Sequence, residues 1–178
     1  MRRLPVLLSA VAVVVLGLVA AARIGSTTAQ ESDGPDLAGS WRVVVSAADG
    51  RTFLTLSTFG ADGTVLTSGL PAQQAPPGTP PGVVFVSTAH GAWAATGADT
   101  ANATFVHLRA NADGQPLGTI TPRLGITLGA DGQTFSGEFV TTLADPAGKT
   151  LATFSGTIQA TRIVAEAPGM PPAGTPAA

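Results

Sequence analysis

The chain contains no cysteine among its 178 residues. This absence excludes disulfide bonds, zinc sites built from thiolates, cysteine nucleophiles and a lipid-modified cysteine. Only two histidines are present, so a metal site with three histidine ligands is impossible. Charged residues make up 11% of the chain, and the formal net charge is -2. Because no basic patch is available to hold a phosphate backbone, we do not expect nucleic acid as a partner.

Motifs for familiar enzymatic chemistry are also missing. The sequence has no Gly-x-Ser-x-Gly elbow, no phosphate-binding loop and no dinucleotide fingerprint. Only one acid, Glu138, falls inside an expected strand, on its outer face, so paired carboxylates for acid–base catalysis have few candidates. His90 and His107 are weak catalytic candidates, since either would act as a general base if it faced an interior site. We therefore expect no metal and no cofactor, and we favour a non-enzymatic role.

The N-terminal region has the layout of an export signal. Met1-Arg2-Arg3 is basic, and residues 4–22 are almost wholly apolar. A basic start before an apolar run is typical of a signal peptide, and small residues up to position 29 offer cleavage sites. The run is also just long enough to span a bilayer, so an uncleaved membrane anchor is the alternative. Both interpretations place the folded domain outside the cytoplasm, either secreted or anchored by residues 4–22.

The composition changes again on both sides of the expected domain. Residues 1–29 form the signal peptide or anchor, and residues 30–36 form a polar linker. The folded domain is expected over residues 37–164. Residues 165–178 are rich in proline, alanine and glycine, and they predict a disordered tail.

The expected domain consists of short β-rich segments separated by turns. Asp-Gly pairs begin at positions 49, 62, 113 and 131, and Asp and Gly tolerate the backbone conformations of tight hairpins. Consecutive hairpins predict an all-β, single antiparallel up-and-down (meander) barrel of about eight strands, because closure leaves no exposed edge. The expected strands span residues 39–46, 51–59, 64–68, 83–87, 91–96, 101–110, 117–128, 134–143 and 150–163.

Alternation of apolar and polar residues along these segments predicts one buried face. Leu54 and Leu56 share such a face in the second segment, whereas Thr and Ser are expected on the solvated outer face. Small residues between large ones would leave space inside the barrel. The residues expected to line this space and bind a ligand are Trp93, Phe135, Phe139, Phe154 and Ile158. For Trp93 a second role stays open, in which its ring plugs the lumen.

Residues 71–82 interrupt the strand pattern with several prolines. Proline cannot serve a central strand ladder, so this segment predicts a loop with polyproline II character. Three interpretations stay open: a lid over the mouth of the barrel, a solvated connector, or a proline-rich docking motif.

Two distant segments carry a further pattern. Gly39-Ser40-Trp41 opens the first expected strand, and Arg162 lies in the last one. A Gly-x-Trp on the first strand and an Arg on the last resembles the calycins, the barrel group of lipocalins, fatty-acid-binding proteins and avidins. The resemblance implies a calycin-like barrel in which Gly39, Trp41 and Arg162 close one end, with the Arg lying across the Trp as a cation–π contact.

The resemblance and the apolar interior imply an exported barrel that binds a small apolar molecule in its lumen without transforming it. One alternative is a cyclase or isomerase that resembles allene oxide cyclases and dirigent proteins, in which a similar cavity guides cyclisation. Another alternative is a structural or interaction module whose lumen is filled by its own side chains. A large cavity would argue against this last alternative, and a polar residue in the cavity, above all His107, would favour the enzyme.

Overall fold

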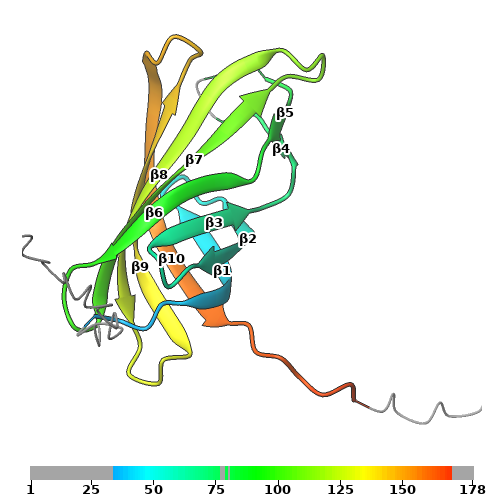
Figure 1. Ribbon diagram of the computed structural model, residues 1–178. Helices are drawn as coiled ribbons and strands as arrows, with labels where there is room; N and C mark the ends of the chain where they lie inside the picture. The colour runs from blue at the N-terminus through cyan, green and yellow to red at the C-terminus, as the bar shows by residue number, and fades with distance from the viewer. Residues whose placement is uncertain (1–33, 77–78, 80, 170–178) are drawn as a thin grey trace, which may run out of the picture. The chain divides into compact units, whose positions relative to one another are not determined.

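The computed structural model describes residues 34–76, 79 and 81–169. These residues form ten β-strands and no helix (Figure 1). The described part of the chain therefore contains no helix of the length and apolarity needed to cross a membrane. The expected signal or anchor at residues 1–29 lies outside the described residues. Of the expected tail, residues 165–169 are described and carry no strand.

Eight strands close into an antiparallel up-and-down barrel. They are β1 (Gly39–Ala47), β2 (Thr52–Phe59), β3 (Thr64–Ser68), β6 (Ala89–Ala95), β7 (Thr100–Ala110), β8 (Pro116–Leu128), β9 (Thr134–Ala144) and β10 (Thr150–Arg162). Each strand pairs with the next in this order, and β10 pairs with β1 to complete the ring. The prediction of a single all-β, up-and-down barrel is therefore confirmed.

The remaining strands, β4 (Ala72–Gln74) and β5 (Val83–Val86), lie outside the ring. β4 pairs with β5, and β5 pairs with β7 beyond the end of β6 (Figure 1). β3 and β4 thus form one arm of a long hairpin, and β5 and β6 form the other arm. The prediction of a loop over residues 71–82 is wrong at β4, because the prolines at 71 and 76 flank the three paired residues and occupy none of them.

The turns have the chemistry that the Asp and Gly residues predict. Their glycines have positive φ, from 64° at Gly132 to 87° at Gly50, a region that other residues rarely adopt. Side-chain oxygens of Asp49, Asp62 and Asp131 accept hydrogen bonds from backbone N–H groups two residues further on. These bonds fix each turn locally, so the hairpin predictions are confirmed.

Side chains alternate between lumen and solvent as expected along most of the barrel; in β7 every second residue from Ala101 to Arg109 is buried. β2 is the exception. Leu54 and Leu56 are each 55% exposed, whereas Ser57 is buried, so the expected face of this strand is wrong. Both faces of β2 carry apolar residues, so the sequence of this strand does not determine which face is buried. Its pairing with β1 does, because Ser57 lies opposite the inward-pointing Trp41 and therefore also points inward.

Candidate functional site

One end of the barrel is closed by Arg162 and Trp41, which lie opposite each other on β10 and β1. The guanidinium carbon of Arg162 is 4.3 Å from the centroid of the Trp41 ring. Its three nitrogens donate hydrogen bonds to the carbonyls of Gly132 at 2.9 Å, Ala38 at 2.6 Å and Asp36 at 2.6 Å. Arg162 therefore ties the last strand to the β8–β9 turn and to the segment that leads into β1.

Gly39 is required by this arrangement. Its φ is +127°, and a Cβ at this position would lie 2.8 Å from Nη1 of Arg162. Trp41 is fully buried, and its indole N–H donates to the carbonyl of Leu37 at 2.9 Å. The structure thus brings together the three residues that the calycin pattern singled out.

Four aromatic rings form the floor of the lumen at this end. Trp41 packs on Phe135 with ring centroids 4.8 Å apart, and Phe135 meets Phe59 edge-on at 6.0 Å. Phe59 in turn meets Trp93 edge-on at 6.1 Å. The indole N–H of Trp93 donates to the carbonyl of Gly60 at 2.8 Å, which fixes the ring in this position. Trp93 is therefore part of the floor.

Above the floor a cavity of about 1040 Å³ begins in the lumen and extends to exposed residues of β1 and β2, including Arg42, Leu54 and Leu56. Its lining is mostly apolar and includes four of the five residues expected there, Phe135, Phe139, Phe154 and Ile158. Trp93 does not line it, because Phe59 stands between its indole and the cavity. The sequence could not show this, since Trp93 lies on the inward face of its strand and only the packing of Phe59 separates it from the cavity.

A few polar side chains also face the cavity. The hydroxyls of Ser57 and Thr67 form a hydrogen bond with each other, and both residues are buried. Thr141 lines the cavity from the other side of the barrel and is also buried. Sequence reasoning missed these three because it assigned Ser and Thr to the outer face. Each of the three lies two residues from a buried apolar residue on its own strand: Ser57 from Phe59, Thr67 from Val65 and Thr141 from Phe139. Since every second residue of a strand faces the same side, this spacing indicates that they point inward.

His107 is the most distinctive polar group of the cavity lining. Its Nδ1–H donates to the carbonyl of Ser87 at 2.8 Å, and its ring lies edge-on to Phe105 at 5.9 Å. Burial lowers the pKa of His107, and the hydrogen bond to Ser87 only partly opposes this effect. His107 is therefore a neutral imidazole at neutral pH. His90, the other weak catalytic candidate, is exposed on the outer face of β6.

No Asp or Glu lines this cavity in the described part of the chain. His107 consequently has no carboxylate within the site to orient it or to stabilise its charged form. Next along the inward face of β7, Arg109 is buried and donates to the carbonyl of Leu117 at 2.8 Å. It does not line the cavity.

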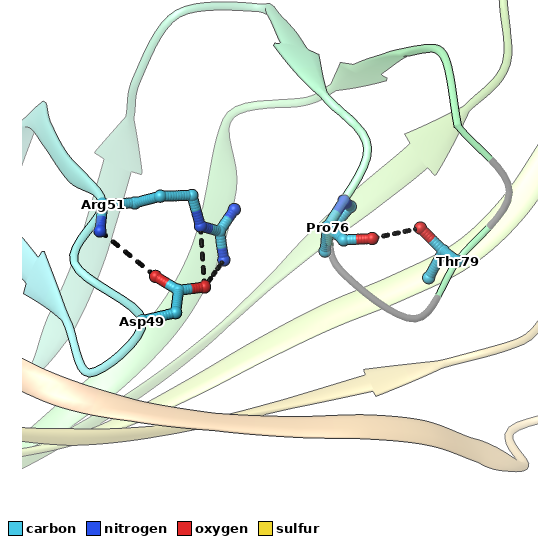
Figure 2. A network of polar contacts seen from close by, with 4 residues as sticks. All are labelled: Asp49, Arg51, Pro76 and Thr79. Atoms are coloured by element: carbon cyan, nitrogen blue, oxygen red, sulfur yellow. Dashed lines mark hydrogen bonds and ion pairs between the residues drawn. The ribbon is translucent and has the colours of Figure 1, made fainter.

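The open end is bordered by the β1–β2 turn and by the hairpin arm that contains β4. Arg51 in the turn forms an ion pair with Asp49 at 2.8 Å (Figure 2). Its guanidinium carbon is 6.0 Å from the Phe154 ring centroid. In the hairpin, the hydroxyl of Thr79 donates to the carbonyl of Pro76 at 2.6 Å (Figure 2). Pro76 also lines the cavity, together with Gln73 and Gln74. The lid hypothesis for residues 71–82 stays a prediction.

Comparisons with known proteins include a match among solved structures. The chain is similar to a solved structure of a redesigned β-barrel, with 16% sequence identity and a TM-score of 0.44. The matched region covers 72% of this chain and 92% of that chain. No protein-family model matches the sequence, and no curated protein matches it.

Proposed function

We propose that this barrel binds a small apolar molecule in its lumen and does not transform it. The observation that carries the proposal is the cavity of about 1040 Å³ with its mainly apolar lining. Sites for small organic molecules commonly have volumes of about 300–1,000 Å³, and a few polar groups among apolar walls are their usual form. A lumen filled by its own side chains would not leave a space of this size.

The polar groups of the cavity support an apolar ligand. The Ser57 and Thr67 hydroxyls satisfy each other, and the Nδ1–H of His107 is satisfied by Ser87. An ionised ligand group buried among them would lose its hydration without gaining a partner of opposite charge. Burial of apolar surface, at about 25 cal/mol per Å², would instead supply the affinity.

Two finer assignments belong to the same proposal. The calycin-like character rests on Arg162 lying across Trp41 at the closed end. Export rests on the basic start and the apolar run at residues 4–22. N-terminal sequencing of the extracellular protein tests export: a start close to residue 30 is expected, and an intact Met1 in the membrane fraction would indicate an anchor.

The binding proposal is tested by introducing a large side chain at two adjacent positions of β1, one that lines the cavity and one that does not. Val45 lines the cavity, whereas its neighbour Val44 does not. Val45→Trp should therefore weaken binding of the fluorescent probe N-phenyl-1-naphthylamine by about tenfold or more, since overpacking costs about 1–3 kcal/mol. Val44→Trp adds the same side chain outside the cavity and should leave the affinity within about twofold. Circular dichroism checks that both variants fold. Equal affinities for two folded variants would contradict binding in the lumen.

A further inference from the structure

The wall of the barrel is incomplete beside β2. This strand pairs with β1 from Thr52 onward, but it pairs with β3 only from Leu56 to Phe59. After Ser68 the chain turns toward β4, which pairs with β5 instead of β2. Within the described residues, Thr52 and Phe53 therefore have no strand on this side, and a gap separates them from the β3–β4 arm. Beyond this gap the arm approaches β2 again at Gly69, where an added Cβ would lie 3.5 Å from the carbonyl oxygen of Leu54 and 3.5 Å from the Thr55 side chain.

The residues that line the cavity show that it reaches this gap. On β8, β9 and β10 the lining residues are all inward-pointing members of the strand alternation. On β2, by contrast, every residue from 52 to 57 lines the cavity, including the outward-pointing Leu54 and Leu56. A cavity that is bordered by both faces of one strand passes around the edge of that strand. The lumen therefore opens sideways between β2 and the β3–β4 arm.

The outer lip of this opening is apolar. Leu54 and Leu56 are each 55% exposed, and Leu70 on the opposite arm is 74% exposed. All three line the cavity. Single exposed apolar side chains are common on protein surfaces. A group of them around an opening indicates a surface that binds an apolar molecule or an apolar part of one.

The lip also carries a cation. Arg42 on β1 lies opposite Leu56, which in turn lies opposite Ser68, and all three border the cavity. Arg42 is exposed and forms no ion pair with any described residue. Arg51 differs, because Asp49 already neutralises it. Arg42 is thus an unneutralised positive charge beside an apolar opening whose lining contains no acid.

We propose that the ligand is an amphipathic anion, with its apolar chain inserted through this gap and its anionic group outside at Arg42. The proposal rests on the proposed function and names the class of ligand. An apolar chain gains free energy by entering the lumen, whereas an anionic group would lose its hydration there. At the lip the same group keeps contact with water and meets a cation, so the two halves of such a molecule match the two parts of the site.

The first test compares two probes with the same chain, dodecanoate and dodecanol, by displacement of N-phenyl-1-naphthylamine. Dodecanoate should bind about two- to fivefold more tightly than dodecanol, the range expected of one exposed ion pair. Arg42→Gln should remove this difference, and so should about 1 M salt, which screens exposed charges. The matched control is Arg123→Gln, since Arg123 is exposed on β8, contacts Thr142 and does not line the cavity. This control should keep the preference for dodecanoate.

The second test blocks the gap. Because the chain has no cysteine, single cysteines can be introduced at chosen positions and labelled with a bulky polar maleimide. The label on Leu54→Cys should slow association of dodecanoate by about tenfold or more, as expected if access needs this opening. Val140→Cys provides the control, because Val140 is 47% exposed on β9 and does not line the cavity. Its label should leave the association rate unchanged.

The outcomes separate this proposal from the proposed function. If neither the fluorescent probe nor either twelve-carbon compound binds the folded wild-type protein, binding in the lumen is wrong. If both compounds bind equally well and Arg42→Gln changes nothing, the anionic class of ligand is overturned while binding in the lumen stands. If the Leu54→Cys label leaves association as fast as the Val140→Cys label does, the gap is not the route.

Discussion

The contacts at the closed end of the barrel predict how much two substitutions lower the free energy of unfolding. Trp41 is fully buried, and replacing a buried aromatic residue by Ala commonly costs about 3–5 kcal/mol. We therefore expect Trp41→Ala to lower the free energy of unfolding by about this amount. Arg162→Met keeps the apolar stem and removes three hydrogen bonds to backbone carbonyls. Since part of this site is accessible to water, we expect a smaller loss, about 2–3 kcal/mol.

The interaction between the two side chains is measured by their double variant. A cation–π contact with the guanidinium 4.3 Å from the ring centroid should contribute about 0.5–2 kcal/mol. The loss in the double variant should be smaller than the sum of the two single losses by about this energy, because the contact can be lost only once. Denaturation in urea at constant m-value gives the four free energies of the cycle.

The matched control pairs Arg162→Met with Leu143→Ala. Leu143 is fully buried but lines the cavity beyond the floor of aromatic rings, away from Arg162. These two changes should add within about 0.3–0.5 kcal/mol. If the Trp41 and Arg162 changes are equally additive, the contact makes no energetic contribution, and the reasoning about the closed end is refuted.

Two other substitutions test single features of the structure. The pKa of His107 is lowered in the folded state, so the unfolded state binds the proton first as the pH falls, and stability should decrease below about pH 6.5. Urea denaturation between pH 7 and 5 should show a shallower decrease for His107→Gln than for wild type; an unchanged slope in His107→Gln would contradict the role of burial. Gly39→Ala should cost about 1–3 kcal/mol because of its positive φ and the approach of Arg162, while Gly125→Ala, with no atom within 4 Å of the added Cβ, should be close to neutral. Thermal unfolding of both variants provides the measurement, and equal midpoints would show that Gly39 is not constrained.

The fold was predictable where local chemistry determines it. Asp-Gly pairs favour hairpins largely independently of the strand sequences, because the glycine adopts the positive φ of the turn and a nearby Asp or Asn side-chain oxygen accepts backbone N–H groups. The alternation in β9 is also strong, with Phe135 and Phe139 on one face and Glu138 on the other. The buried face of this strand could therefore be predicted without ambiguity. The pairing of Trp41 with Arg162 joins residues far apart in the sequence, and only the calycin pattern indicated it.

The remaining features depend on contacts that no local pattern encodes. Leu54 and Leu56 face outward because pairing with β1 fixes the register of β2, although the strand is apolar on both faces. Ala72–Gln74 become a strand because Val83–Phe85 lie alongside them. The opening beside β2 is a result of strand lengths, since β3 ends at Ser68 before it can cover the start of β2.

Binding in the lumen can be tested most directly by locating a heavy atom on a bound chain. In a crystal of the protein with 12-bromododecanoate, anomalous scattering identifies the bromine at the apolar end of the molecule. We predict a bromine peak inside the barrel, among Phe139, Ile158 and the other apolar residues that line the cavity. A bound molecule whose bromine lies on the outer surface, with the lumen occupied only by protein side chains, would contradict the proposed function.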